Sequence, residues 1–167
     1  MKRRQSGFTL IELLIVIAII GILASIALPN LLNAVHRGRQ KKTMADMRTL
    51  ATALESYIVD NNRYPAAASS TCPANAFSAE GSALSSASFT NLVPTYISQL
   101  PGRSGTDGWN HAFYYNLSTS GTSYNIRSRG KDNSLQTSLS CGTTTSFNDD
   151  FVFTNGAFLQ WPEGTQH

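Results

Sequence analysis

A positively charged head and a small residue precede a long apolar run at the amino terminus of this 167-residue chain. Lys2, Arg3 and Arg4 come first, Gly7 follows, and the apolar run covers residues 8–28. A secretory signal places its small-residue cleavage site after the apolar region. Cleavage after Gly7 would instead remove only the charged residues, so the sequence predicts that the apolar segment remains as a working part of the mature protein.

The apolar run has the length of a membrane-spanning helix. Residues 8–28 number about 21, close to the ~20 that a helix needs to cross the hydrocarbon of a bilayer. The basic residues ahead of the run predict a cytoplasmic amino terminus with the remainder translocated. A plain membrane anchor would satisfy both observations.

Glu12 argues against a plain anchor. A carboxylate within a membrane helix costs a few kcal/mol near the bilayer centre, less toward an end, and usually has a function. Cleavage before Phe8 would create a positive α-amino group one helical turn from Glu12. At ~4 Å and an effective dielectric of ~20, that amine and the carboxylate would attract by roughly 4 kcal/mol before desolvation is subtracted. The partner amine could belong to the same chain or to a neighbouring one.

These first twelve residues, Lys-Arg-Arg-Gln-Ser-Gly before Phe-Thr-Leu-Ile-Glu, resemble the processing site of type IV pilins and type II secretion pseudopilins. The resemblance implies that a prepilin peptidase cleaves between Gly7 and Phe8 and methylates the new amino group of Phe8. It assigns Glu12 the task of aligning an incoming subunit with the amine of a previous one. It also implies a helix that continues past Pro29 and unwinds locally between Gly21 and Pro29 in a filament. Without the resemblance, Pro29 would be read as a helix end at the membrane surface, because proline lacks the amide donor that a continuous helix uses.

The helix is expected to continue through residues 30–62 as an amphipathic segment. Apolar residues recur there at steps of three and four, which places them on one helical face that we expect to pack on a sheet. They are Leu31, Leu32, Val35, Met44, Met47, Leu50, Ala51, Leu54, Tyr57 and Ile58. A basic stretch interrupts them at His36, Arg37, Arg39, Lys41 and Lys42. That stretch is consistent with a solvated face, with binding to anionic lipid headgroups, or with pairing to acidic residues of a neighbouring subunit.

Residues 63–167 are predicted to form a small α+β head. Strand patterns occupy residues 112–117, 123–128, 151–154 and 157–161. Asn155-Gly156 between the last two is a strong hairpin signal. We therefore expect a small antiparallel sheet that covers the exposed half of the helix.

Two segments of the head resemble the major pseudopilin of type II secretion systems. Asp107-Gly-Trp-Asn110 stands where that family has an Asp-Pro-Trp-Gly-Asn-like turn, although Gly108 replaces the proline. Ser128-Arg-Gly-Lys-Asp132 matches a Ser-x-Gly-x-Asp loop. The resemblance implies a calcium site formed by Asp132 with Asp149 or Asp150, together with carbonyl oxygens. Calcium takes 6–8 oxygens in flexible geometry, which suits carboxylates spread over a loop. Ordinary turn aspartates are the alternative.

The loop of residues 129–150 is long enough to need something that organises it. Besides calcium, a disulfide between Cys72 and Cys141 is a candidate, because an even, distant pair of cysteines in an exported domain usually forms a bridge. Two unpaired thiols are the alternative.

The composition argues against an enzyme or a nucleic-acid-binding protein. The chain has 13 Lys and Arg against 10 Asp and Glu, and the leader accounts for the whole excess. His36, His111 and His167 are scattered and form no nucleophile–His–acid pattern with their neighbours. We expect no catalytic activity and no specific nucleic acid.

These observations and the resemblance lead to one prediction of architecture. The chain comprises a cleaved leader (1–7), a transmembrane and assembly helix (8–29), its amphipathic continuation (30–62) and a soluble periplasmic or extracellular head (63–167). The resemblance implies a pilin fold anchored once in the bacterial inner membrane and then built into a periplasmic or cell-surface filament.

The predicted function is that of a type II secretion pseudopilus subunit that polymerises through its helix to drive export of folded proteins. A type IV pilin for motility, adhesion or DNA uptake is the alternative, and a membrane-anchored binding module that never polymerises is a third class. The implied partners are other copies of the chain, prepilin peptidase, an inner-membrane assembly platform, minor pilins or pseudopilins, and membrane lipid before assembly.

Overall fold

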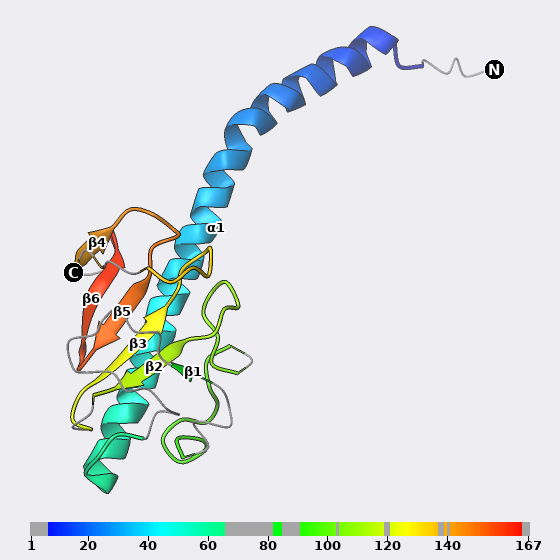
Figure 1. Ribbon diagram of the computed structural model, residues 1–167. Helices are drawn as coiled ribbons and strands as arrows, with labels where there is room; N and C mark the ends of the chain where they lie inside the picture. Colours follow the sequence, from blue (N-terminus) through cyan, green and yellow to red (C-terminus); the bar gives the residue numbers. More distant parts are fainter. Residues whose placement is uncertain are drawn as a thin grey trace, which may run out of the picture. The chain divides into compact units, whose positions relative to one another are not determined.

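The computed structural model describes residues 7–65, 82–84, 91–102, 104–118, 121–136, 139 and 141–164. The chain divides into two compact units, residues 1–37 and residues 38–167. Helix α1 (Leu10–Asn61) contributes residues to both units. Figure 1 shows this helix with the strands of the second unit beside its later half.

Helix α1 ends where the sequence predicts. Asn62 follows the last helical residue with a φ of 56°, and its amide donates to the carbonyl of Ile58 at 2.8 Å. A left-handed residue of this kind commonly closes a helix, and asparagine tolerates it better than most side chains. Pro65 lies three residues further on, where a helix could not easily continue.

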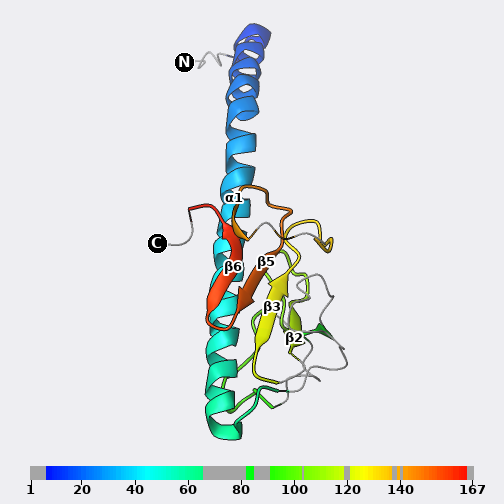
Figure 2. The ribbon, with the colours of Figure 1, turned by 60° about the vertical axis from the view of Figure 1, so that its left-hand side comes forward.

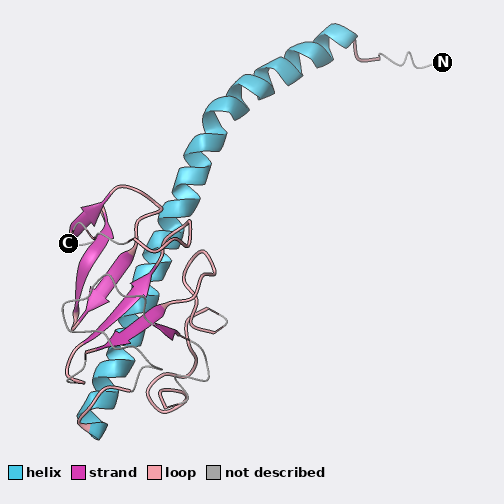
Figure 3. Cartoon of the chain, in the orientation of Figure 1, coloured by secondary structure: helices cyan, strands magenta, loops and turns pink. Residues whose placement is uncertain are grey.

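The described part of the head contains a six-stranded mixed sheet with the strand order β1-β2-β3-β5-β6-β4. Figures 2 and 3 show its strands stacked along the later part of α1. The strands are β1 (Ser82–Ala83), β2 (Tyr114–Leu117), β3 (Tyr124–Ser128), β4 (Gly142–Thr144), β5 (Phe151–Thr154) and β6 (Ala157–Pro162).

The four strands expected from the sequence are confirmed as β2, β3, β5 and β6. The β5–β6 hairpin turns at Asn155 and Gly156, whose φ angles are 43° and 90°. Positive φ at both positions is what a tight primed turn requires, which explains the Asn-Gly signal.

The expectation of a purely antiparallel sheet is wrong at one edge. Strand β4 pairs parallel to β6, with Thr143 opposite Trp161, whereas all other strand pairs are antiparallel. Three small residues, Gly-Thr-Thr, make up β4, and so short a run carries no alternating pattern. It lies in the loop of residues 129–150, where only its pairing with β6 makes it a strand.

The core of the head joins one face of α1 to the sheet. The predicted stripe is confirmed in its second half, where Met44, Met47, Leu50 and Leu54 are at most 3 % exposed. Apolar side chains of the strands and of the segment before β2 complete this core: Phe113, Tyr115, Tyr124, Ile126, Phe151 and Phe153. The predicted stripe is wrong in its first half, since Leu31, Leu32 and Val35 are 60 %, 58 % and 44 % exposed.

Candidate functional site: the amino-terminal segment and the head loop

The first unit presents an apolar surface along its whole helical segment. Large apolar side chains from Phe8 to Val35 are between 44 % and 89 % exposed. The helix is long and apolar enough to cross a membrane. An uncovered surface of this kind needs lipid or other protein helices around it.

Glu12 lies in the first turn of α1 and forms a reciprocal capping box with Thr9. The amide and hydroxyl of Thr9 donate to Glu12 Oε2 at 2.9 and 2.7 Å, and the Glu12 amide donates to Thr9 Oγ1 at 3.3 Å. This arrangement satisfies amides that the start of a helix would otherwise leave unpaired. The Thr-x-x-Glu spacing is a known capping signal, and it went unused in the sequence reasoning.

The capping box leaves part of the Glu12 carboxylate available. Both donors from Thr9 go to Oε2. Among the residues that the structure describes, none donates to Oε1, so this oxygen remains available to a further donor. The partial positive charge of the helix start also stabilises a carboxylate at this position.

Gly21 and Pro29 both lie inside α1, which continues past the proline. The reading of Pro29 as a helix end is therefore wrong. Polar side chains next to the proline bind helix carbonyls: Asn30 Nδ2 donates to Ile26 O at 3.2 Å, and Ser25 Oγ donates to Ile22 O at 2.8 Å. These bonds go to the carbonyls of Ile26 and Ile22, whereas the carbonyl that Pro29 deprives of its helical donor is that of Ser25. The local unwinding between Gly21 and Pro29 in a filament stays a prediction.

Gly7 and Phe8 precede the helix and are both exposed, Phe8 by 81 %. They lie in neither a helix nor a strand. Residues 1–6 of the leader lie outside the described residues.

In the head, the turn that begins at Asp107 binds the loop that follows β3. Asp107 is 3 % exposed, and its Oδ1 accepts the amides of Trp109 and His111, each at 2.9 Å. Its Oδ2 accepts the Ser128 hydroxyl at 2.7 Å, and His111 Nδ1 lies 2.9 Å from the Gly130 carbonyl oxygen. The two segments that carry the pseudopilin resemblance are thus bonded to each other.

Gly108 brings the same turn against α1. Its amide donates to Thr43 Oγ1 at 2.9 Å, and a Cβ at this position would lie 2.4 Å from the carbonyl oxygen of Arg39. Proline has no amide to donate. The departure from the family turn at this position therefore has a physical reason, which is close contact with the helix backbone.

The basic stretch of the helix has one internal ion pair. Lys42 Nζ lies 2.7 Å from Asp46 Oδ2, one turn along α1. Arg37, Arg39 and Lys41 are exposed. The structure thus leaves open the three interpretations of this stretch.

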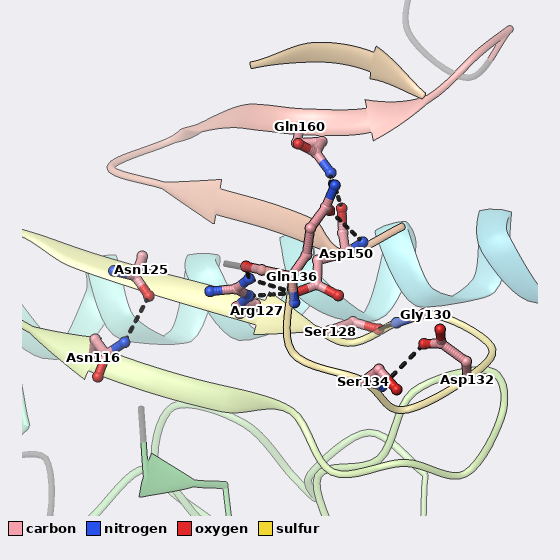
Figure 4. A network of polar contacts seen from close by, with 10 residues as sticks. All are labelled: Asn116, Asn125, Arg127, Ser128, Gly130, Asp132, Ser134, Gln136, Asp150 and Gln160. Atoms are coloured by element: carbon pink, nitrogen blue, oxygen red, sulfur yellow. Dashed lines mark hydrogen bonds and ion pairs between the residues drawn. The ribbon is translucent and has the colours of Figure 1, made fainter. Parts of the chain in front are cut away.

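The loop after β3 closes around a buried ion pair. Arg127 and Asp150 are 2 % and 0 % exposed, and Asp150 Oδ2 accepts Arg127 Nε at 2.6 Å and the Gln136 amide at 3.1 Å. Arg127 Nη2 also donates to the Gln136 carbonyl oxygen. Gln160 Nε2 completes the network with donors to Gln136 Oε1 and Asp150 O, each at 2.9 Å (Figure 4).

The protonation equilibrium of Asp150 reflects this balance. Burial raises the pKa of the Asp150 carboxyl, and the Arg127 guanidinium offsets part of that rise. The buried Arg127 charge thus helps keep the carboxylate ionised.

The three carboxylates expected to hold calcium have different surroundings. Asp132 is exposed, and its Oδ1 accepts the amide of Ser134 in its own turn at 2.9 Å. Asp150 is buried on Arg127, and Asp149 is half-buried. The described residues hold no group of three or more His, Cys, Asp or Glu side chains placed for a metal ion.

The surroundings of Asp150 bear on whether a metal ion could bind there. Asp150 Oδ1 is buried and accepts no hydrogen bond within the described part of the chain. A divalent cation on Oδ1 would, however, have the Arg127 guanidinium across the same carboxylate. Like charges about 5 Å apart repel by several kcal/mol even at an effective dielectric of ~20. These residues fit a protein cation better than calcium, and the calcium site itself stays a prediction.

The disulfide also stays a prediction. Cys141 is exposed and precedes β4, while Cys72 lies outside the described residues.

A long apolar helix that enters a small α+β head is a pilin-like layout, and comparison with known proteins agrees. The family described as "Prokaryotic N-terminal methylation motif" matches residues 2–28. The family described as "Type II secretion system (T2SS), protein G" matches residues 30–141, more than half of the chain. The chain belongs to the type II secretion system protein G family.

Similar curated proteins include type II secretion system core proteins G and a type IV pilin. The chain is 53 % identical to type II secretion system core protein G of Aeromonas hydrophila over 64 residues, which cover 38 % of this chain and 45 % of that protein. It is 46 % identical to the protein of that name in Vibrio cholerae over 63 residues, covering 38 % and 43 %. It is also 48 % identical to the type IV major pilin protein PilA of Myxococcus xanthus over 61 residues, covering 36 % and 28 %.

The matched stretch spans less than half the length of these relatives. No solved structure matches the chain.

Proposed function

We propose that this protein is a structural subunit of a type II secretion pseudopilus, which polymerises through its amino-terminal helix and assists the export of folded proteins. The exposed apolar segment from Phe8 to Val35, with a capped carboxylate at its start, carries the proposal. Membership of the protein G family supports it. The family is one of structural proteins, and we assign no catalytic activity to the chain.

Assembly would begin in the membrane. Prepilin peptidase would cleave between Gly7 and Phe8 and methylate the new amine, since the methylation motif covers these residues. Subunits anchored in the inner membrane, with the amino terminus cytoplasmic, would then join an assembly platform and the minor pseudopilins. In the filament the apolar segments of neighbouring chains would replace lipid around each other.

Glu12 is proposed to set the position of each new subunit. Its Oε2 is bound by Thr9, whereas Oε1 has no donor among the described residues. Oε1 could therefore accept the amine of Phe8 of a neighbouring chain while the capping box stays intact. Away from water such a charged pair is much stronger than at a surface.

The test is a deletion of the gene complemented with variants. Glu12→Ala should insert into the membrane normally, yet exported proteins should disappear from the culture supernatant and no filaments should form. Glu163→Ala, which removes an exposed carboxylate of the head, serves as the matched control and should restore secretion. Normal secretion by Glu12→Ala would exclude a function through polymerisation.

A surface type IV pilus is the second candidate, and the similarity to the Myxococcus major pilin favours it. The same deletion strain separates the two. Loss of secreted proteins with normal surface pili supports the pseudopilus, whereas loss of pili with normal secretion identifies a pilin.

A further inference from the structure

The head loop between β3 and β5 begins and ends beside a buried ion pair, Arg127 with Asp150. Arg127 lies on β3 and is 2 % exposed, and Asp150 lies immediately before β5 and is fully buried. Their side chains meet at the base of the loop, as Figure 4 shows. A charged side chain is rarely buried this completely unless it is paired.

The oxygen atoms that accept hydrogen bonds from the Arg127 guanidinium are of the kinds that bind a hard metal ion. Arg127 donates to the carboxylate of Asp150 and to the main-chain carbonyl of Gln136. Carboxylate and carbonyl oxygens are also the ligands that calcium takes in a protein loop. A guanidinium satisfies these oxygens through directed N–H donors. Because it is covalently part of the chain, it cannot dissociate into the solvent as a bound metal ion can.

The remainder of the loop is held by further bonds of the chain itself. The Lys131 amide donates to the carbonyl of Phe147 at 2.9 Å, and Gln160 of β6 donates to Gln136 Oε1 at 2.9 Å. At Gly130, a Cβ would lie 2.6 Å from the carbonyl oxygen of Asp149, so its backbone fits closely against residues 147–149. The two ends of the loop are thereby bonded to each other, and Gln136 is bonded to strand β6.

We propose that Arg127 supplies the positive charge that the family resemblance assigns to calcium, and that the head therefore folds without a bound divalent cation. The inference concerns the stability of the head and does not depend on which filament the subunit forms.

Thermal unfolding of the full-length chain in detergent tests the proposal. Both tryptophans of the chain, Trp109 and Trp161, lie in the head, so their fluorescence reports on its unfolding. The midpoint should be the same in EDTA and in millimolar calcium, a concentration that saturates many extracellular calcium modules. A midpoint that falls in EDTA and returns with calcium, but not with magnesium, would overturn the proposal.

Variants give an independent measurement. Arg127→Met should lower the midpoint by roughly 10 °C or more in either buffer, because it leaves the Asp150 carboxylate buried without its partner. Arg63→Met removes an exposed arginine and should leave the midpoint unchanged. The double variant Arg127→Met with Asp150→Leu should regain much of the loss, since it removes both charges.

The carboxylates of Asp132 and Asp149 distinguish the two cations. Asp132→Asn and Asp149→Asn should unfold at the wild-type midpoint if Arg127 is the cation of the loop. A large fall in these variants, equal to the effect of EDTA on the wild type, would show that calcium holds the loop instead. Wild-type stability in Arg127→Met would also refute the proposal.

Discussion

The two halves of helix α1 are equally helical but differ in what covers their apolar side chains. Between Phe8 and Val35 those side chains are exposed, whereas Met47, Leu50 and Leu54 are at most 1 % exposed. Between the two sets lies the basic stretch, with Arg37, Arg39 and Lys41 exposed. The comparison shows that apolar content alone does not predict burial, because the chain's own sheet covers the apolar side chains of the second half only.

The same substitution in each half should give the largest contrast. Leu54→Ala should lower the free energy of unfolding of the head by about 2–5 kcal/mol, since it opens a cavity in a packed core. Leu13→Ala, at a residue that is 55 % exposed, should leave that free energy unchanged. Denaturant unfolding followed by tryptophan fluorescence measures both. Equal losses would show that the first half is also part of the folded head.

Alkaline pH should destabilise the head, which includes the second half of α1, and should leave the first half of the helix unchanged. Burial and a hydrogen bond to Glu55 raise the pKa of Tyr64 to about 12, and burial raises the pKa of Tyr115 and Tyr124 further. Because these groups lose protons more easily when the chain unfolds, their contribution is present below pH ~10 and is lost as pH rises toward 12. For Tyr64 alone this amounts to about 2–3 kcal/mol.

Parallel pH titrations of tyrosinate absorbance and tryptophan fluorescence measure this effect. Ionisation of the buried tyrosines should coincide with unfolding of the head. Phe8–Val35 contains no tyrosine, so helicity in detergent should survive there. Tyrosinate formation near pH 10 in a head that is still folded would contradict the assignment.

A glycine comparison should give a smaller effect. Gly108→Ala should cost about 1–3 kcal/mol, because its Cβ would lie 2.4 Å from a backbone oxygen of the helix and the turn would have to move. Gly38→Ala has open space within a helix and should stabilise by up to about 1 kcal/mol. Chemical unfolding distinguishes the two signs. A neutral Gly108→Ala would mean that this turn moves away from the helix freely.

The smallest effect is expected at the start of α1. Thr9→Val removes the hydroxyl of the capping box and should cost about 1 kcal/mol of local stability, whereas Thr9→Ser should retain the box. Hydrogen exchange of the first-turn amides in detergent measures the difference, and exchange in the head should not change. Equal protection in the two variants would argue against the box.

Sequence reasoning located the elements whose residues interact with near neighbours. The α1 stripe, the end of the helix and the Asn155-Gly156 hairpin follow from local spacing and backbone preference. Strand β4 could not be found in this way, because its Gly-Thr-Thr residues become a strand only through β6, which follows it by a dozen residues.

The candidate site shows the same limit. Glu12 was found from its charge in an apolar segment, and its Thr9 partner was readable from the Thr-x-x-Glu spacing. The Arg127–Asp150 pair joins residues 23 positions apart. The sequence shows Asp149 and Asp150 as alternative calcium ligands, but it does not show the arginine that the fold brings to Asp150.

The place of β6 in the strand order has a consequence for how the head is made. β6 lies between β5 and β4, so it is an interior strand although it is the last of the described strands along the chain. Neither β4 nor the outer side of β5 can be paired until residues 157–162 have emerged. An unfinished chain therefore exposes two unpaired strand edges, which are prone to aggregation. Completion of the sheet thus waits for residues 157–162, and the sheet of a shorter chain would stay open at β5.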